Sequence, residues 1–463
     1  MRRRKILKMA ISTAVSTMLL DSCSQQSSKA KLPGDNKAIY LSQNVNSATT
    51  QVGVDWSKIV AESTPFTFGS NDFQVTNISN AKDPAYHSQI AQLGFGLIRI
   101  HHAGLVDSWT DPMSRTWNFT KIKAFYDEYS STRATIIQNI PGWPMWMRLD
   151  ERGLLHPSEY DNYAVFCATL VDIINNRLGR QVIYWEPLNE KDVAYQNAGR
   201  INELWLIYNR VAQAMKARDQ RIKIGGPVLT WDEPIRLGSF LQACRPNVDF
   251  ISWHRYATGD VNVSTAALMS FTPRYGEQVR MLRRVAVRNI PNRHIPLLLG
   301  EYNINYSWRS GENRQNTHIG AVWFASVLKH LAEAGVDMAT SWNLKDGIYG
   351  LIDHRNQPRL AATVFAWAIK YLTGSVMATS SNNSFVEAMA VQQKDGKRSL
   401  LLINKSDSFA NLTLRGMNTI NFADTVSVLY LNANGVRNST IDKAVLLGQS
   451  LNLPPYSLAL LLI

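Results

Sequence analysis

The feature that most constrains the fold is the alternation of short apolar runs with longer amphipathic stretches between residues 65 and 373. The apolar runs have the length of buried strands, and the stretches between them carry apolar residues at helical spacing. Eight such units follow one another, and eight is the number of parallel strands that closes a (β/α)8 barrel, so the pattern predicts this α/β fold. The expected strands are Phe66–Ser70, Leu97–His101, Ala134–Asn139, Val182–Trp185, Ile222–Gly226, Phe250–His254, Pro296–Gly300 and Ala339–Trp342.

An open, doubly wound sheet is the alternative interpretation of the same pattern. Such a sheet normally carries a glycine-rich phosphate loop after its first strand. The residues at that place, Gly69-Ser70-Asn71-Asp72, lack the glycine spacing of such a loop. The closed barrel, over residues 63–374, is therefore the preferred fold.

The two ends of the chain depart from the alternating pattern. Over residues 375–463, short strand-like runs are separated by Asn, Asp, Ser and Gly turns without a helical signal. This pattern predicts a small antiparallel β-sandwich-like domain. Residues 37–62 also have an extended pattern, and we expect them to add a strand to that C-terminal domain.

Residues 1–23 have the order of an export signal. The basic segment MRRRKILK precedes the apolar run Met9–Leu20, and the sequence DSC follows. The segment ending at Cys23 resembles a bacterial lipobox, in which the cysteine carries a lipid, and the double arginine resembles a twin-arginine signal. Residues 24–36 are expected to form a polar tether. The sequence therefore predicts export to a bacterial cell envelope, in the periplasm or on the outer surface, with membrane contact only through a lipid anchor at Cys23.

The formal net charge is +13, and the leader contributes five cations and one acidic residue to it, so the remaining chain is also basic. A basic surface suits anionic polysaccharide, nucleic acid or phospholipid, or is simply solvated. Basic clusters and aromatic residues do not interleave in any segment, so a nucleic-acid partner is not expected. Three cysteines exclude a disulfide scaffold and a cysteine-rich zinc site, and we expect Cys167 and Cys244 to be buried thiols.

Two glutamates follow expected strands at the edge of the barrel where active sites lie. The fourth expected strand leads into WEPLNE, in which Asn189 directly precedes Glu190, and the seventh leads into GEYN, which contains Glu301. Strands four and seven lie three apart around a ring of eight, so their ends face each other across the barrel mouth. Cleavage of a glycosidic bond needs such a pair, because one carboxylic acid protonates the leaving oxygen and a second carboxylate attacks or stabilises the anomeric carbon.

The motifs WEPLNE and GEYN resemble those of the clan of (β/α)8 glycosidases that places its acid/base after Asn on strand four and its nucleophile at the end of strand seven. Within that clan, the barrel, the C-terminal β-domain and the string from Trp185 to Asp192 resemble glycoside hydrolase family 39. This family includes β-xylosidases, α-L-iduronidases and bacterial exopolysaccharide glycosidases. The resemblance implies that Glu190 is the acid/base and Glu301 the nucleophile. Lys191 departs from the family pattern, which commonly has proline after the acid/base.

Further strand ends carry candidate sugar-binding residues. His254 and Tyr256 lie two apart on the sixth strand and can share one face; the resemblance places such a pair beside the nucleophile. It also implies that Arg99 steadies the nucleophile and that Trp342 forms the floor of the sugar site. His101 is a weaker candidate. The alternative for these residues is a packing role inside the barrel.

Trp143, together with Trp146, follows the third strand, and the two could form an outer platform on which a sugar stacks. Taken together, the sequence predicts a retaining glycoside hydrolase that cleaves β-linked polysaccharide or oligosaccharide, such as bacterial exopolysaccharide, without a metal or cofactor. A β-xylosidase acting on xylan fragments and a non-catalytic carbohydrate-binding barrel are the alternatives. The sugar, the linkage, exo or endo action and the oligomeric state stay open.

Overall fold

The computed structural model describes residues 49–74, 83–130, 132–307, 311–448 and 450–463. The expected leader, the expected tether and the start of the extended segment at residues 37–62 lie outside these residues. Within them, no helix combines the length and the hydropathy needed to span a membrane.

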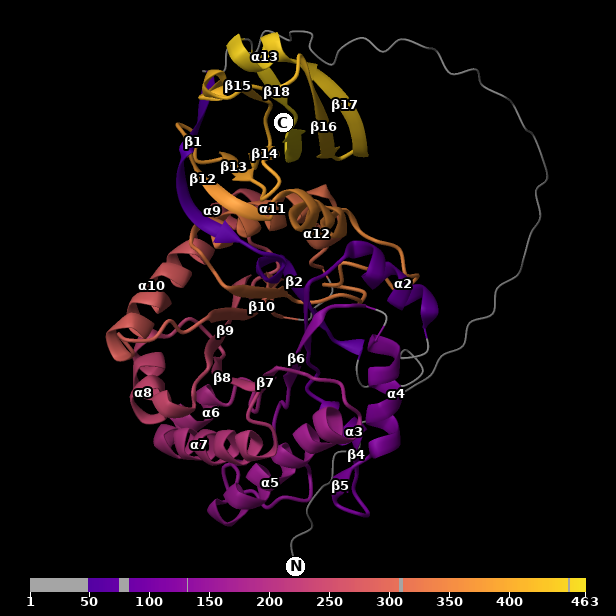
Figure 1. Ribbon diagram of the computed structural model, residues 1–463, viewed down its shortest axis with the longest axis vertical. Helices are drawn as coiled ribbons and strands as arrows, with labels where there is room; N and C mark the ends of the chain where they lie inside the picture. Colours follow the sequence, from indigo (N-terminus) through magenta and orange to yellow (C-terminus); the bar gives the residue numbers. More distant parts are fainter. Residues whose placement is uncertain (1–48, 75–82, 131, 308–310, 449) are drawn as a thin grey trace, which may run out of the picture. The chain divides into compact units, whose positions relative to one another are not determined.

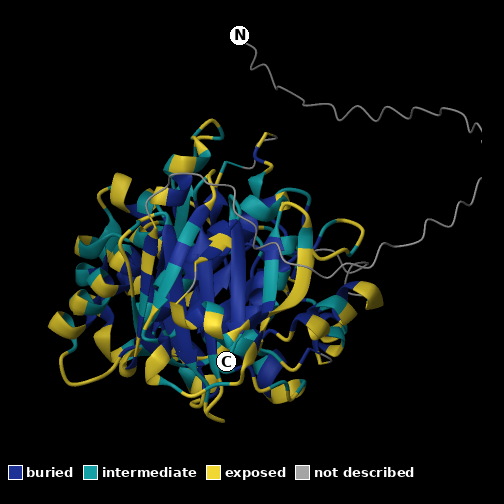
Figure 2. Ribbon diagram, turned by 90° about the horizontal axis from the view of Figure 1, so that it is seen from above, coloured by how far each residue is buried: buried dark blue, intermediate teal, exposed yellow. Residues whose placement is uncertain are grey.

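Eight parallel strands of the described chain close into a barrel in which the strands follow one another around the ring in sequence order (Figure 1). This arrangement confirms the predicted (β/α)8 fold. Figure 2 shows the buried strands inside and the exposed residues on the surrounding helices and loops. The barrel strands are β2 (Gly69–Asp72), β3 (Leu97–Ile100), β6 (Thr135–Asn139), β7 (Tyr184–Glu186), β8 (Lys223–Leu229), β9 (Phe250–Thr258), β10 (Leu297–Asn305) and β11 (Met338–Ser341).

Helices connect the strands and surround the barrel, and a two-stranded hairpin, β4 (Thr110–Asp111) with β5 (Thr116–Trp117), follows β3. Half of the longer helices begin at a side chain that accepts a backbone N–H bond, as Asp83 and Asn118 do. The helices are α2 (Pro84–Leu93), α3 (Leu105–Trp109), α4 (Phe119–Tyr129), α5 (Tyr160–Val171), α6 (Asp192–Asn197), α7 (Ile201–Arg218), α8 (Pro234–Cys244), α9 (Thr265–Ser270), α10 (Pro273–Asn289), α11 (His318–Glu333) and α12 (Leu360–Tyr371).

The first barrel strand begins later than its apolar run predicts. Phe66 and Phe68 belong to a 3₁₀ turn, Pro65–Phe68, rather than to the strand. The proline occupies the first turn, and the hydroxyls of Thr64 and Thr67 cap it reciprocally, so local capping chemistry prevails over the apolar pattern. The strand consequently extends two residues past its predicted end and includes Asn71.

The C-terminal part forms an antiparallel-rich sheet of nine strands in the described residues, which confirms the predicted antiparallel β-domain. β1 lies within this sheet, antiparallel to β12 and parallel to β15. One short helix, α13 (Lys443–Gly448), interrupts the strands, where the turn pattern predicted no helix. The strands are, in order across the sheet, β17 (Gly435–Asp442), β16 (Thr425–Asn432), β19 (Ser457–Leu462), β14 (Arg398–Asn404), β13 (Val386–Gln392), β12 (Gly374–Ser381), β1 (Thr50–Ser63), β15 (Ala410–Arg415) and β18 (Leu451–Leu453).

Helix α11 is buried on nearly all sides because it packs between the barrel and this sheet. A buried polar cluster joins the two parts. Glu387 on β13 accepts bonds from Lys405 Nζ at 2.5 Å, from Ser326 Oγ at 2.5 Å and from His330 Nε2 at 2.9 Å. Burial raises the pKa of Glu387, but the bond and charge of His330 and the charge of Lys405 outweigh it and lower this pKa to about 2.

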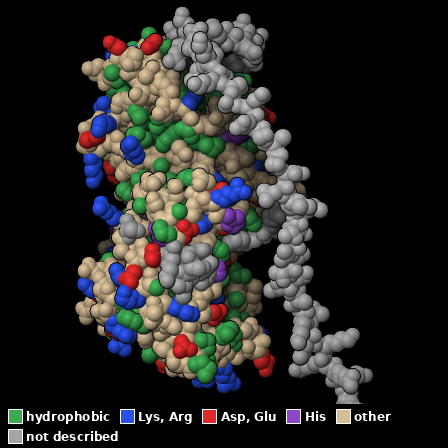
Figure 3. Space-filling view, turned by 90° about the vertical axis from the view of Figure 1, so that its right-hand side faces the viewer, with side chains coloured by type: hydrophobic (Ala, Val, Ile, Leu, Met, Phe, Trp, Pro, Cys, Tyr) green, Lys and Arg blue, Asp and Glu red, His purple; other side chains and the backbone are tan. Residues whose placement is uncertain are grey.

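Charged side chains are dispersed over one face of the molecule. On the face that Figure 3 shows, Lys and Arg side chains alternate with Asp and Glu rather than forming one basic block. Cys167 and Cys244 are buried free thiols, as predicted.

Candidate active site

Glu190 and Glu301 lie at the carboxyl ends of strands on opposite sides of the barrel mouth. Glu301 is part of β10 and is buried, whereas Glu190 follows β7 and its side chain is 35% exposed. The backbone of Glu190 has φ +49°, which side-chain-bearing residues rarely adopt, and its N–H donates to the carbonyl of Val228 at 3.1 Å. One oxygen of each carboxylate lies within 4.8 Å of the other. The two predicted glutamates are therefore brought together.

Arg99, on β3, connects the strand ends beneath the two glutamates. Its fully buried guanidinium donates from Nε to Glu186 at 2.6 Å, from Nη1 to Asn71 at 3.0 Å and to Glu301 at 3.1 Å, and from Nη2 to Asn189 at 2.8 Å. Strands β2, β7 and β10, together with the loop after β7, thus contribute partners to one cation. The planar fork of arginine fixes the directions of these bonds, so Arg99 orients both Glu301 and the residue before Glu190.

Glu186 and Asn71 belong to this site but were not among the predicted residues. Glu186 is fully buried at the end of β7, and it also accepts a bond from Asn139 at 3.2 Å. Its charge balances that of Arg99, because a buried cation needs a paired anion. The position of Glu186 at the end of a strand could have indicated its role in the site. Asn71 was missed because it lies beyond the predicted end of its strand.

His254 and Tyr256 alternate along β9 and both reach the glutamates. His254 Nδ1 lies 2.7 Å from Glu190 Oε1, and His254 Nε2 lies 3.6 Å from Glu301 Oε1. The hydroxyl of Tyr256 donates to Glu301 Oε2 at 2.9 Å. Parallel pairing of β9 with β10 sets Glu301 opposite His254, which explains this placement.

The pKa values of these groups are linked. Burial lowers the pKa of His254, but the charges of Glu301 and Glu190 and the bond to Glu190 raise it above its ordinary value. Burial raises the pKa of Glu190, yet the bond and charge of His254, with Arg99 and Lys191, lower it. Glu301 has a raised pKa because burial and the negative charge of Glu190 outweigh His254, Arg99 and Tyr256. These opposite shifts favour one shared proton on the Glu190–His254 pair, and its positive charge offsets the repulsion that Glu190 exerts on Glu301.

Two further predicted residues, His101 and Trp342, follow strands β3 and β11. His101 Nδ1 donates to Asn139 Oδ1 at 2.8 Å, and its Nε2 lies 3.6 Å from Glu301 Oε1. Burial and the charge of Arg99 lower the pKa of His101 well below its ordinary value, so it is neutral. Trp342 follows β11, with its ring 5.5 Å from that of His101 and 5.1 Å from that of Phe73.

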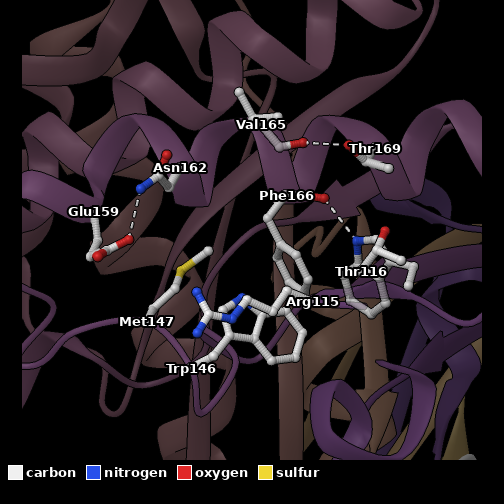
Figure 4. Close-up of a pocket in the computed structure, with 10 residues that line it drawn as sticks. Arg115, Thr116, Trp146, Met147, Glu159, Asn162, Val165, Phe166 and Thr169 are labelled. Atoms are coloured by element: carbon white, nitrogen blue, oxygen red, sulfur yellow. Dashed lines mark hydrogen bonds between the residues drawn. The ribbon is translucent and has the colours of Figure 1, made fainter. Parts of the chain in front are cut away.

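Trp143 and Trp146 do not form one platform, because they line different hollows. Trp143 lines a hollow of about 310 Å³ that also contains Glu190 and Lys191, and its edges pack against Tyr163 and Tyr195. Trp146 lines a second hollow of about 450 Å³ between α5 and the hairpin β4–β5 (Figure 4).

One side-chain atom each from Glu190, His254 and Glu301 lies within 4.8 Å of the other two, which is a spacing that a metal ion could use. The surroundings do not fit a cation. Arg99 Nη1 lies 3.1 Å from Glu301, and His254 Nδ1 already bonds Glu190. A divalent ion here would face the fixed positive charge of the guanidinium.

A closed (β/α)8 barrel with two facing glutamates, an arginine beneath them and aromatic side chains around them defines a glycosidase-type barrel. Residues 44–360 match the family model described as "Glycosyl hydrolases family 39", and the chain belongs to this family. The resemblance to this glycoside hydrolase family that the sequence motifs predict is thereby confirmed.

Curated relatives include two β-xylosidases. The β-xylosidase of Geobacillus stearothermophilus is 24% identical over 50% of this chain and 50% of its own length. That of Caldicellulosiruptor saccharolyticus is 29% identical over 24% of each chain. The matches to these relatives thus span half of the first and about a quarter of the second.

Solved structures share the fold at low identity. The family 39 enzyme of Xanthomonas axonopodis pv. citri has a TM-score of 0.66 at 17% identity and covers 92% of this chain and 99% of its own. A monomeric β-xylosidase of Caulobacter crescentus CB15 has a TM-score of 0.65 at 14% identity, covering 89% and 99%. These similarities support the barrel and the C-terminal sheet as one architecture.

Proposed function

We propose that this glycoside hydrolase cleaves β-glycosidic bonds with retention of configuration, through a covalent glycosyl-enzyme. The observation that carries the proposal is the approach of one oxygen of each carboxylate to within 4.8 Å of the other, which leaves little room for a water molecule between them. Retaining enzymes hold their carboxyl groups about 5–5.5 Å apart, whereas inverting enzymes separate them by roughly 6.5–9.5 Å to admit a water molecule.

Glu301 is the proposed nucleophile. Arg99 and Tyr256 both bond its carboxylate, at 3.1 and 2.9 Å, so the ionised form is oriented and stabilised. Its side chain is only 7% exposed, which keeps bulk water from the ester that it would form with the sugar.

Glu190 is the proposed acid/base. It is the more exposed of the two, on the side where a leaving group departs and water enters, and it shares a proton with His254. In the first half-reaction Glu190 donates this proton to the glycosidic oxygen as Glu301 attacks the anomeric carbon. In the second half-reaction it takes a proton from water as the glycosyl–Glu301 ester breaks.

For the sugar, β-xylosidase activity on xylan fragments is the first candidate, supported by the two curated relatives of that name. A second candidate is a β-linked polysaccharide such as bacterial exopolysaccharide, supported by the basic balance of the chain, +13. Hydrolysis of an aryl β-glycoside panel followed by a polysaccharide panel distinguishes the two.

The mechanism is tested by trapping. Incubation with a 2,4-dinitrophenyl 2-deoxy-2-fluoro-β-glycoside of the accepted sugar should leave one sugar on the peptide that contains Glu301, detected by mass spectrometry. The Glu301→Gln variant should remain folded, acquire no label and lack hydrolytic activity. An initial product with inverted anomeric configuration, measured by proton NMR, would exclude double displacement.

We also propose export to the bacterial cell envelope with a lipid on Cys23, supported by the leader sequence. Stable anchoring depends on acyl chains, so Cys23→Ser should release the protein from the membrane fraction of its own host. A variant that stays with the membranes would count against lipidation.

A further inference from the structure

Lys191 directly follows Glu190, and its ammonium faces a hollow of about 310 Å³ beside that glutamate. The side chain is half-buried, with Nζ 5.2 Å from the centre of the Trp143 ring. A Cβ at Gly142 would lie 3.2 Å from Nζ, so the glycine leaves the ammonium the room that it occupies. The hollow is lined by His101, Ala103, Val106, Asp107, Pro141, Gly142, Trp143, Asn189, Glu190 and Lys191.

The position of the hollow relates it to one side of the scissile bond. Glu190 and Asn189 are in its wall, whereas Glu301 and Trp342 are not. Since an acid/base protonates the oxygen of the departing group, the space beside Glu190 and away from Glu301 receives that group. This step rests on the proposed function, and in particular on the assignment of Glu190.

The ammonium of Lys191 has no carboxylate within ion-pair distance among the residues that the structure describes. The ammonium lies over the Trp143 ring, and it also interacts electrostatically with Glu190 at longer range. Burial lowers the pKa of Lys191, and Glu190 partly restores it. A half-buried cation that lacks an anion is stabilised when a ligand supplies one.

Asp107 is the other charged residue of the hollow besides the Glu190–Lys191 pair. It is exposed at the rim and forms no ion pair with Lys191 in the described chain. The hollow therefore carries the ammonium of Lys191 next to Glu190 on its inner wall and the carboxylate of Asp107 at its rim, and Lys191 and Asp107 have opposite effects on an anionic ligand.

We propose that Lys191 selects substrates whose leaving-group sugar is anionic. An ammonium is a compact point charge, so it would recognise either the carboxylate of a uronic acid or a sulfate ester. The proposed preference depends on the cation at position 191.

The test uses transfer from the glycosyl-enzyme to sugar acceptors. An activated donor, a 2,4-dinitrophenyl β-glycoside that the enzyme hydrolyses, forms the ester with Glu301. An acceptor hydroxyl in the hollow then attacks the anomeric carbon, the ester bond breaks and Glu190 takes the hydroxyl proton. D-glucuronate and D-glucuronamide are the matched acceptors, since they share size and differ in charge; D-glucose 6-sulfate and D-glucose form the sulfate arm.

For the wild-type protein we expect the anionic acceptor to give about 10- to 100-fold more transfer than its neutral partner, as for a charge-assisted hydrogen bond. Lys191→Met should bring that ratio close to one, and Asp107→Asn should increase it. Lys123→Met, which removes an exposed lysine of α4, is the charge-matched control and should keep the wild-type ratio.

Each ratio is measured within one variant, so a general loss of activity or stability cancels. A ratio near one in the wild-type protein for both acceptor pairs overturns the proposal, as does an unchanged ratio in Lys191→Met. A Lys191-dependent preference in the glucuronate arm assigns a uronic acid, and one in the sulfate arm assigns a sulfated sugar. Failure of the wild-type protein to release dinitrophenol from any donor would instead contradict the proposed function.

Discussion

His254 Nδ1 lies 2.7 Å from Glu190 Oε1, so a residue of strand β9 holds a proton jointly with the glutamate that follows β7. The raised pKa of His254 and the lowered pKa of Glu190 mean that this pair keeps its proton above pH 6.5, the ordinary pKa of histidine. A lone carboxylic acid would lose its proton at lower pH. Under the proposed mechanism, the histidine therefore extends the pH range in which a proton is available for the leaving group.

The first prediction concerns this pair. In the His254→Gln variant, the proton has to reside on Glu190 alone. The pKa of Glu190 rises when the histidine charge is lost, but it stays that of a carboxylic acid. The alkaline limb of kcat/KM, which in the wild-type protein follows deprotonation of the pair, should therefore move to lower pH. Tyr256→Phe is the control, because it removes a bond to Glu301 and leaves the pair intact. An alkaline limb that is unchanged in His254→Gln would show that the proton is held elsewhere.

Strand ends explain why the two glutamates could be predicted from sequence. The barrel pattern sets Glu190 and Glu301 at the same rim, and the structure brings them together. The supporting charges were harder to infer. Asn71 fell outside its predicted strand because the capped turn at Pro65–Phe68 displaces that strand, and a buried Glu186 is recognisable only once its partner Arg99 is in place. The separation of Trp143 from Trp146 depends on loop geometry, which periodicity does not encode.

The second prediction tests Glu190 as the acid/base. Glu190→Ala should slow cleavage of natural linkages by about 10²–10⁴-fold, because a poor leaving group needs a proton. Formation of the glycosyl-enzyme from a dinitrophenyl glycoside should hardly change, so a burst of phenolate should precede slow turnover. Added azide needs no base and should restore turnover, giving a glycosyl azide of retained configuration. Equal slowing of both substrate types without azide rescue would remove Glu190 from this role.

The third prediction concerns Trp342 as a sugar platform. Trp342→Ala should lower kcat/KM by roughly 2- to 10-fold, the range of a lost aromatic contact, and Trp342→Phe should retain most of the activity. Trp146→Ala is the comparison, since that ring lines a different hollow (Figure 4). Steady-state kinetics alongside thermal unfolding separates binding from packing. Similar losses in the two alanine variants would assign Trp342 to packing.

The fourth prediction concerns the buried cluster around Glu387. Its pKa of about 2, against an ordinary value of 4.5, corresponds to about 3 kcal/mol of stability at neutral pH. Because the folded-state pKa is lowered, this contribution is complete above pH 4.5 and is lost as the pH falls towards 2. Denaturant unfolding at several pH values measures how the free energy of unfolding changes with pH.

Glu387→Gln should cost roughly 3–5 kcal/mol at neutral pH, since it leaves the ammonium of Lys405 buried without its anion. The double variant Glu387→Gln with Lys405→Met should be less destabilised than Glu387→Gln alone. A double variant that loses the sum of the two single effects would show that the ion pair is not coupled.

The placement of β1 in the C-terminal sheet has a consequence for the order of folding. Ser63 donates to the carbonyl of Leu372, 309 residues further along the chain, and most of the barrel lies between them. During synthesis the first described strand emerges long before either of its neighbours, and until then it presents unpaired backbone groups and an apolar face. The native contacts of β1 can form only after β12 and β15 have left the ribosome. A chain that ended before β12 would therefore contain every barrel strand and would leave β1 as an open, aggregation-prone edge.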